Sequence, residues 1–520
     1  MRRMNSVDAV IVGAGAAGAF YARHLAESGR SVAVLEAGPG WQHTDLQSSL
    51  IWARRLRWGG EQVVTTGEHP FGYGFNAGWG NGGAATHHYG TWLRLDESDF
   101  EMRSRFGRGR DWPFDYATLR PYYDRIQKAV GLSGDAEAEI WRPAGDPYPM
   151  PPLATFGQAE AIRRGFDAMG MHTAPMPMAI NSQPYAGRAA CIYDGWCDAG
   201  CPTGALYNPL VRDVPGALAA GAEIRNHASV IRVTSRNGRA TGVEYADADG
   251  ERCFQPASVV VLAASAVHNP AILLNSASDD WPDGLANRSG QVGRGFMTHS
   301  VAGIYGLFKE DTEPFMGVSG AQLSCRDGYG KDREQGFGSY QWLIAPAMKP
   351  NGLLGMAVTR ADLYGDALHA FIRRASHHMA NMLAMGEDLP DPDNRVVLGE
   401  GRDGYGRRPA KVVHRFTDDA MAVHRHARGE GLAVMRAAGA DEAWAGPLGT
   451  AHMMGGTPMG SDPADSVVDG YGRSHDVPNL VLAGTGLFPT AGANNPTYTM
   501  YAVALRGVER LIDDWDAVAA

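Results

Sequence analysis

Residues 7–18 read VDAVIVGAGAAG, a short apolar run that leads directly into a G-x-G-x-x-G pattern. The apolar run predicts a strand, and the residues after the last glycine have a helical pattern. Glycines at 13, 15 and 18 allow a tight turn and let the backbone approach a pyrophosphate that sits at the helix N-terminus. The stretch therefore predicts the start of a dinucleotide-binding unit.

A second strand and an acidic residue follow at the spacing that such a unit requires. Residues 31–36 read SVAVLE, and Glu36 lies about twenty residues beyond the loop, where a carboxylate accepts hydrogen bonds from a ribose 2′-OH. A glycine-rich loop alone is a weak signal, and an ordinary turn is the alternative. The order strand, loop, helix, strand and acid favours the nucleotide site.

Two segments near the C-terminus carry residues suited to acid–base chemistry. Residues 449–460 (GTAHMMGGTPMG) place His452 in a glycine-rich turn, and residues 488–497 (FPTAGANNPT) place two asparagines before Pro496. In alcohol oxidation the oxygen loses a proton while the carbon loses a hydride, so a histidine base beside an asparagine that holds the same oxygen suits that reaction. A lone histidine is more often structural, but this setting favours His452 as the catalytic base.

Taken together, these motifs resemble the glucose-methanol-choline (GMC) family of FAD-dependent oxidoreductases. The sequences of these motifs are most similar to those of the branch that contains pyranose oxidase and the gluconate, fructose and glucose dehydrogenases. The resemblance covers nearly the whole chain, and it includes residues 80–89 (GNGGAATHHY), 261–274 (VLAASAVHNPAILL), 291–297 (QVGRGFM) and 478–484 (PNLVLAG). It implies an α/β (mixed α+β) fold, with a Rossmann-like FAD-binding domain interleaved with a substrate-binding domain of a sheet and helices.

The resemblance assigns catalytic and cofactor-binding roles to numbered residues. His452 would deprotonate the alcohol while hydride passes to flavin N5, and Asn495 would hold the alcohol. Asn495 matches the family position when counted back from Pro496 and Thr497, which leaves Asn494 as backbone support. The residues expected at the FAD are Gly13, Gly15, Ala16, Ala17, Gly18, Glu36, Ala37, Gly82, Gly83, Thr86, His87, Val230, Ala264, Ala483, Gly484, Asn495, Pro496 and Thr497.

His87 stands where pyranose oxidase carries its FAD covalently, in a G-G-x-x-T-H pattern. Thr86 and His87 match that pattern, although His88 follows where an aromatic residue is usual. A covalent bond between His87 and the flavin is one reading. The other is a histidine that simply lies against the flavin.

Three of the five cysteines cluster in a C-x5-C-x3-C run, formed by Cys191, Cys197 and Cys201. This spacing is wrong for a C-x-x-C redox pair, and a similar run in related FAD-dependent dehydrogenases holds a three-iron cluster. The resemblance therefore implies a [3Fe–4S] cluster on three thiolates. Three reduced structural cysteines, or a disulfide in an exported protein, are the alternatives.

The chain of 520 residues is long enough for two intertwined domains. We expect a discontinuous FAD-binding domain at residues 1–110, 205–300 and 446–520, and substrate-binding or cap regions at residues 111–204 and 301–445. Residues 223–226 predict a strand, and residues 230–233 and 242–245 predict a hairpin with its turn at 236–238. A helix over residues 501–514 is expected to close the chain.

Composition limits the partners and the location. The net charge of −10 argues against a general nucleic-acid surface. The longest apolar runs are about half the ~20 residues that a membrane helix needs. We therefore expect no nucleic acid and no membrane span, with a cytoplasmic location. The alternative is periplasmic export alongside a small subunit, and an electron-acceptor protein is a further expected partner.

Three classes of function remain open. An FAD enzyme that oxidises a hydroxyl of a sugar, sugar acid or aryl (phenylpropanoid) alcohol is favoured, as a dehydrogenase rather than an oxygen-using, pyranose-oxidase-like oxidase. A pyridine-nucleotide flavoprotein reductase would need a second strand, G-x-G-x-x-G and helix, which residues 78–83 do not provide. A non-catalytic binding protein of the same fold is the third class, and the pair His452 and Asn495 argues against it.

Overall fold

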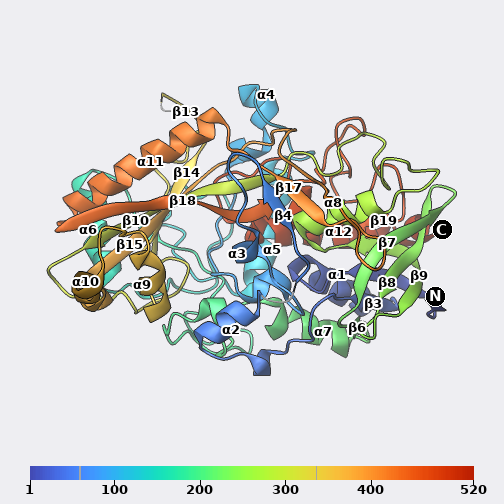
Figure 1. The fold of residues 1–520 in the computed structure, drawn as a ribbon, viewed down its shortest axis with the longest axis horizontal. Helices are drawn as coiled ribbons and strands as arrows, with labels where there is room; N and C mark the ends of the chain where they lie inside the picture. Colours follow the sequence, from blue (N-terminus) through green and yellow to red (C-terminus); the bar gives the residue numbers. More distant parts are fainter. Residues whose placement is uncertain (58–59, 335) are drawn as a thin grey trace.

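The strands form two large sheets and two small ones in a computed structural model that describes residues 1–57, 60–334 and 336–520. Figure 1 shows one large sheet, with β3 (Val32–Leu35) and β9 (Arg252–Leu262), near both chain termini, and the other, with β10 (Met297–Leu307), β15 (Met379–Gly386) and β18 (Glu442–Met454), at the opposite end. Helix α12 and the segments around α3 lie between the two groups of strands. None of the described helices is both long enough and apolar enough to cross a membrane.

The first sheet is built around a parallel βαβ unit. Strand β2 (Val7–Val12), helix α1 (Ala16–Glu27) and strand β3 (Val32–Leu35) follow the predicted order, and the two strands pair in parallel. The strands in spatial order are β6 (Glu223–Arg225), β3, β2, β9 (Arg252–Leu262), β8 (Arg239–Ala246) and β7 (Ser229–Arg236), with β19 (Leu480–Leu482) and β1 (Arg2–Arg3) also paired to β9.

The local predictions in this part of the chain are confirmed. Strands β7 and β8 form an antiparallel hairpin, and its turn residues Asn237 and Gly238 have φ angles of 53° and 75°. Positive φ at both central residues is the geometry that Asn-Gly favours in two-residue hairpins. The last helix of the chain is α13 (Trp515–Ala519), so the predicted closing helix is the one before it, α12 (Thr497–Asp513), which begins four residues before the predicted start at Tyr501. Its first turn therefore follows directly from Pro496.

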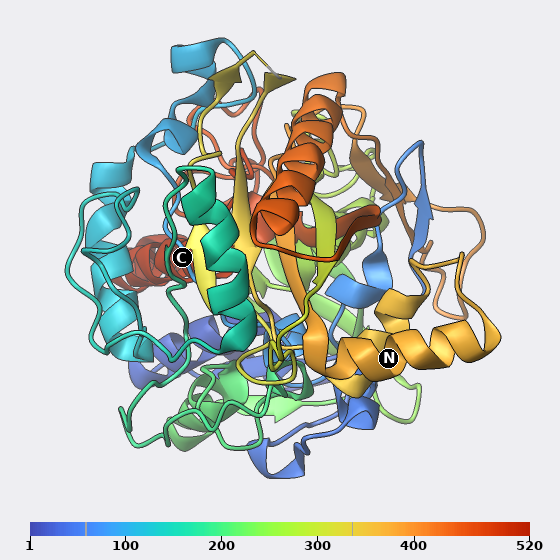
Figure 2. The ribbon, with the colours of Figure 1, turned by 90° about the vertical axis from the view of Figure 1, so that its left-hand side faces the viewer.

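The second sheet is antiparallel and carries helices on one face. Its strands in spatial order are β18 (Glu442–Met454), β10 (Met297–Leu307), β15 (Met379–Gly386), β14 (Tyr340–Ile344), β11 (Leu323–Cys325) and β5 (Ala174–Pro175). Helices α6 (Gly157–Ala168) and α11 (Asp418–Ala437) lie across this sheet (Figure 2). They bury a core with Ile304, Trp342 and Met382. Neighbouring residues on the same strands point to the opposite face, where Leu343 and Met385 pack with Cys197 and Cys201.

The remaining elements connect and cover the two sheets. The helices are α2 (Leu50–Arg55), α3 (Tyr73–Asn76), α4 (Met102–Phe106), α5 (Tyr116–Val130), α7 (Asp213–Ala219), α8 (Ser265–Asn275), α9 (Pro350–Ala357), α10 (Gly365–His378) and α13 (Trp515–Ala519). The strands are β4 (Val64–Thr66), β12 (Asp332–Arg333), β13 (Gly336–Phe337), β16 (Arg395–Leu398) and β17 (Ala410–Val413). Short 3-10 turns are η1 (His43–Asp45), η2 (Gly83–Thr86), η3 (Glu97–Phe100), η4 (Cys197–Ala199), η5 (Pro209–Val211) and η6 (Thr485–Leu487).

The parallel register of the first sheet brings three distant segments to one edge. Val12 pairs with Leu262, and Leu262 pairs with Leu482, so β2, β9 and β19 end at the same level. In open parallel sheets, ligands bind outside the carboxyl ends of the strands. The turns that follow these three strands therefore meet at the place where such a sheet binds its ligand.

We predict that Gly18→Ala strongly destabilises the protein. A Cβ at Gly18 would lie 1.9 Å from the backbone oxygen of Gly13, so the loop or α1 has to move. Overpacking of this kind typically costs about 1–3 kcal/mol, and a clash with backbone puts this site at the upper end. Urea unfolding monitored by circular dichroism measures the loss.

The matched control is Gly429→Ala in α11. A Cβ at Gly429 meets nothing within 4 Å, so this variant should keep or slightly raise the free energy of unfolding. Equal stability of the two variants would show that α1 does not depend on its close contact with the loop.

Candidate active site

A cavity of about 750 Å³ opens at the carboxyl edge of the first sheet. Its size lies within the range of small-molecule and cofactor sites. It extends from the glycine loop after β2 to the end of β18 and the start of α12. The predicted cofactor residues that line it are Gly13, Gly15, Ala16, Ala17, Glu36, Ala37, Gly83, His87, Val230, Ala264, Ala483, Gly484, Asn495, Pro496 and Thr497.

Gly18, Gly82 and Thr86 are not among the lining residues, and each supports the wall from behind. Gly18 lets α1 pack against the carbonyl of Gly13. Gly82 has a φ of 89°, and its N–H donates to the Ala14 carbonyl at 2.8 Å. Thr86 Oγ1 is directed to the carbonyl of Asn81 at 3.4 Å. Of these contacts, the bond from Gly82 to Ala14 joins the two glycine loops, and the other two fix each loop locally.

The Glu36 carboxylate binds three backbone N–H groups from three separate loops. Oε2 accepts from Ala14 at 2.8 Å, and Oε1 accepts from Gly38 at 2.8 Å and from Gly80 at 3.1 Å. A carboxylate has about four acceptor positions, so one position on Oε2 stays open toward the cavity that Glu36 lines. This open position is where the ribose hydroxyl predicted from the sequence would bind.

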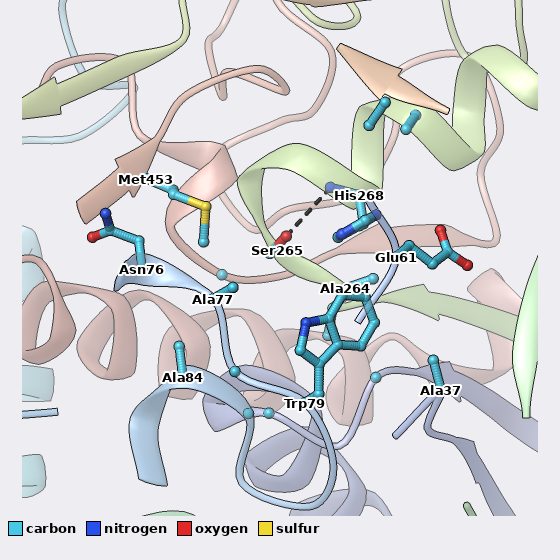
Figure 3. A pocket seen from close by; sticks show the side chains of 18 of the residues that line it. Ala37, Glu61, Asn76, Ala77, Trp79, Ala84, Ala264, Ser265, His268 and Met453 are labelled. Atoms are coloured by element: carbon cyan, nitrogen blue, oxygen red, sulfur yellow. Dashed lines mark hydrogen bonds between the residues drawn. The ribbon is translucent and has the colours of Figure 1, made fainter. Parts of the chain in front are cut away.

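The cavity also has wall residues that sequence reasoning did not identify. In Figure 3, Asn76 and Met453 lie at one end, Glu61 and His268 lie at the other, and the Trp79 indole lies between them. His268 belongs to the turn that starts α8, where its backbone N–H lies 3.3 Å from Ser265 Oγ. His268 and Met453 lie in stretches that the sequence analysis singled out, but nothing in the sequence marks them as wall residues, and only the folded chain brings all of these residues together.

His452 lies at the cavity end of β18 with an unusual backbone conformation. Its φ is 69°, a left-handed geometry that is costly for a residue with a Cβ. Its N–H donates to Asn76 Oδ1 at 2.6 Å. Strained residues of this kind cluster at functional sites, where the surrounding structure fixes them.

A second histidine, His299 on β10, fixes the protonation pattern of His452. His299 Nε2 lies 3.0 Å from the carbonyl oxygen of Gly492, which can only accept, so this nitrogen carries the proton. Burial lowers the pKa of His299 to about 4, which keeps the ring neutral and leaves Nδ1 as an acceptor. His452 Nδ1 lies 2.9 Å from that nitrogen and must therefore donate to it.

The free nitrogen of His452 faces the second predicted catalytic residue. With its proton on Nδ1, His452 presents an unprotonated Nε2, and Asn495 Nδ2 lies 3.4 Å from it. Burial, followed by the nearby His299, holds the pKa of His452 well below its usual range. The imidazole is thus a neutral base aimed at the space beside an amide N–H. Sequence reasoning missed His299, because the antiparallel pairing of β10 and β18 alone brings it near.

Asn494 and Asn495 have different surroundings. Asn494 is fully buried, and its Nδ2 donates to the Arg94 carbonyl at 2.6 Å. Asn495 lines the cavity beside His452. This matches the expectation that Asn494 supports the backbone, and it places Asn495 where it can contact a substrate.

His87 lines the cavity and is 5% exposed. Its Nε2 lies 2.7 Å from the Ala77 carbonyl and so donates to it. Burial, aided by the charge of Arg57, lowers the pKa of His87 to about 3. The ring is therefore neutral and fixed against the wall.

The three clustered cysteines lie close to one another on the face of the second sheet that is opposite α6 and α11. Backbone N–H groups point at each sulfur: Tyr193 at Cys191, Ser319 at Cys197, and Leu206 at Cys201, over 3.3–3.5 Å. All three are free thiols, and burial raises the pKa of Cys191 to about 11. Among the described residues, no three or more His, Cys, Asp or Glu side chains form a group that could hold a metal ion.

The three sulfurs are thus not arranged as a metal site in this structure. The N–H groups that surround their sulfurs are nevertheless of the kind that tunes cluster thiolates.

Comparison with known proteins gives a consistent result. A family model described as GMC oxidoreductase matches residues 7–301, and a second with the same description matches residues 366–504. The chain is 31% identical to the fructose dehydrogenase large subunit of Gluconobacter japonicus, over 98% of both chains. It is 31% identical to 2-methyl-1,2-propanediol dehydrogenase of Mycolicibacterium austroafricanum, over 96% of this chain and 94% of the relative.

A third relative and two solved structures extend the comparison. The gluconate 2-dehydrogenase flavoprotein of Pantoea cypripedii is 27% identical, over 95% of this chain and 91% of its own length. Pyridoxine 4-oxidase from Mesorbium loti superposes with a TM-score of 0.66 at 17% identity, covering 97% of this chain and 98% of its own. A formate oxidase of Aspergillus oryzae RIB40 gives a TM-score of 0.69 at 15% identity, over 99% of both chains. At these identities, the two structures establish the fold alone.

We predict that proton abstraction by His452 continues as the pH falls through 6.5. The folded-state pKa of His452 lies well below 6.5, so the neutral base persists below the pH at which an ordinary histidine becomes protonated. Anaerobic flavin reduction by an alcohol, followed from pH 8 to pH 5 by stopped flow, measures this. A rate that halves near pH 6.5 would contradict the lowered pKa.

Proposed function

The chain belongs to the GMC oxidoreductase family, and we propose that His452 removes the hydroxyl proton of an alcohol that this FAD-dependent enzyme oxidises. One observation carries the proposal. The unprotonated Nε2 of a half-buried, neutral His452 faces the Asn495 amide at 3.4 Å inside the cofactor cavity. A base and a hydrogen-bond donor that share one position suit a substrate hydroxyl.

The residues of the cavity fit FAD. The backbones of Gly13, Gly15 and Gly83 leave room for a pyrophosphate at the N-terminus of α1, and Glu36 has an open acceptor position for a ribose hydroxyl. Ala264 and Ala483 follow the neighbouring strands and line the same space. When bound, FAD supplies the two-electron acceptor for the hydride that leaves the alcohol carbon.

The chain's own residues move the proton. Asn495 Nδ2 donates a hydrogen bond to the substrate oxygen and orients it, while His452 Nε2 takes the proton from that oxygen. His452 then carries a charge, and its Nδ1–H remains bonded to His299 Nδ1, 2.9 Å away. Preorganised hydrogen bonds of this kind are stronger in a partly desolvated cavity than in water.

The substrate proposed for this site is a sugar, a sugar acid or another alcohol, including an aryl alcohol. The names of the fructose, gluconate and 2-methyl-1,2-propanediol dehydrogenases support the sugar and polyol classes. The same names favour a dehydrogenase over an oxygen-using oxidase. An alcohol screen with anaerobic flavin bleaching, followed by reoxidation with oxygen or an artificial acceptor, decides between these possibilities.

We predict that His452→Ala retains FAD and loses substrate-driven flavin reduction. General-base catalysis is typically worth ~10²–10⁴-fold, and the variant should lose about this factor. Asn495→Ala should lose less, or a comparable factor, because it removes only the orienting hydrogen bond. Stopped-flow absorbance under anaerobic conditions measures both, with FAD content as the control. A wild-type rate in His452→Ala would place the base elsewhere.

His87 is proposed as the attachment point of a covalently held flavin. It lines the cavity, and the ring is fixed by its hydrogen bond to Ala77. A non-covalent flavin that lies against His87 uses the same geometry. Both arrangements agree with a neutral imidazole in this wall.

For electron transfer out of the flavin, we propose an iron–sulfur cluster at Cys191, Cys197 and Cys201. The backbone N–H groups around the three sulfurs support it, but the sulfurs are not arranged as a metal site, so no step is derived through it. A partner subunit that accepts electrons is proposed with it, on the printed name of the fructose dehydrogenase large subunit. A cytoplasmic location is proposed too, and cell fractionation tests it.

Cofactor analysis of the anaerobically purified protein gives the next prediction. We expect a yellow protein that contains FAD. If His87 holds the FAD covalently, the yellow colour stays with the acid-precipitated chain, and His87→Ala loses this retention. With a cluster, three irons and four acid-labile sulfides accompany each chain. FAD in the acid supernatant would reject the covalent bond alone. Less than one iron per several chains would reject the cluster, and a protein that takes up no FAD would reject the whole assignment.

A further inference from the structure

Gln341 on β14 is a buried polar side chain that the mechanism has not used. It is fully buried and pairs across the sheet with Met385, which in turn pairs with Val301. Its neighbour Trp342 packs in the core beneath α11, and successive strand residues face opposite sides. Gln341 therefore faces the same side of the sheet as His299, and its amide adjoins Asn495, which lines the cavity.

The orientation of the Gln341 amide follows from the hydrogen bonds at the active site. Because His452 Nε2 is an acceptor, Asn495 must present its Nδ2 to it and turn its Oδ1 away. That oxygen lies 3.5 Å from Gln341 Nε2, which donates to it. A directed chain of bonds thus runs from Gln341 through Asn495, His452 and His299 to the Gly492 carbonyl.

This direction leaves Gln341 Oε1 as an unmatched acceptor. The atom is buried and has no hydrogen-bond partner in the structure. Buried polar atoms nearly always have a partner, because leaving one unmatched costs its full desolvation. A ligand that carries a suitably placed donor would satisfy it.

We propose that Gln341 Oε1 accepts a hydrogen bond from a second hydroxyl, on the carbon next to the one that is oxidised. The first hydroxyl would lie beside the contact between His452 Nε2 and Asn495 Nδ2, and the Gln341 amide adjoins Asn495 at its Oδ1. Hydroxyls on adjacent carbons are close enough to contact neighbouring amides of this kind. The site then prefers vicinal diols and polyols over monohydric alcohols. This inference rests on the proposed function.

A purely positioning role for Gln341 makes a different prediction. If Gln341 only holds the Asn495 amide, its loss slows every alcohol by the same factor. If Oε1 binds the second hydroxyl, its loss slows the diol and leaves the monohydric alcohol much less affected. The ratio of the two substrates separates these roles.

The test compares propane-1,2-diol with propan-1-ol, and butane-2,3-diol with butan-2-ol. Wild-type enzyme should favour each diol in kcat/KM for anaerobic flavin reduction. Gln341→Met keeps the length of the side chain without its polar atoms, and it should lower the diol preference about tenfold, the effect of roughly one neutral hydrogen bond. Gln341→Asn withdraws the oxygen by one methylene and should act in the same direction.

Gln322→Met is the matched control. Gln322 is also buried under this sheet, but its oxygen accepts from Phe156 N–H and its nitrogen donates to the Ala345 carbonyl. Its replacement should lower stability and leave the diol preference unchanged. An equal loss for diol and monohydric alcohol in Gln341→Met, or no loss, would overturn the inference.

A separate measurement distinguishes this result from failure of the proposed function. If wild-type flavin is reduced by neither kind of alcohol, the proposed function fails. Dissociation constants of the same diols, taken from perturbation of flavin absorbance, then test the subsite alone. Tighter diol binding by wild type than by Gln341→Met supports the subsite, and equal binding overturns it.

Discussion

The Glu36 carboxylate is the interaction on which the cofactor cavity depends. It joins the loop after β2, the turn after β3 and the loop before η2 through three backbone N–H groups. Charged acceptors make stronger hydrogen bonds than neutral ones, and a buried carboxylate left without them would be very costly. The close approach of Gly15 and Gly83 is possible only while these loops stay joined. One side chain therefore fixes three walls before any ligand binds.

The catalytic end of the cavity depends instead on a single backbone carbonyl. The Gly492 carbonyl accepts a hydrogen bond from His299. This bond fixes which nitrogen of His299 carries the proton, and therefore which atoms of His452, Asn495 and Gln341 donate and accept. The polarity of the site is thus set by a group that no side-chain substitution removes. Its position comes from the loop before α12, whose Ala493 N–H is held by the Tyr329 hydroxyl at 3.2 Å. That hydroxyl in turn donates to the buried Asp99 carboxylate.

The sequence predicted the parts of the molecule that depend on local order. The βαβ unit and the hairpin turn at Asn237 each follow from spacing within a short window. His452 and Asn495 were assigned to one site by the family resemblance, and both line the cavity. His299 and Gln341 escaped prediction because their side chains meet His452 and Asn495 only through hydrogen bonds across 153 and 154 residues. The cysteine run was conspicuous in the sequence, but spacing alone does not set the distances between sulfurs. The start of α12 was misplaced because Pro496 favours a helix beginning immediately after it.

The left-handed backbone of His452 creates a trade-off between stability and activity at this residue. Conformations of this kind store about 1–3 kcal/mol, and glycine adopts them freely. Glycine at 452 relieves that strain and removes the base in the same change. A laboratory evolution campaign that selects only for heat resistance therefore has an accessible route that abolishes turnover. Mutant libraries of this protein should therefore keep residue 452 constant and seek stabilising substitutions at exposed positions of helices such as α11.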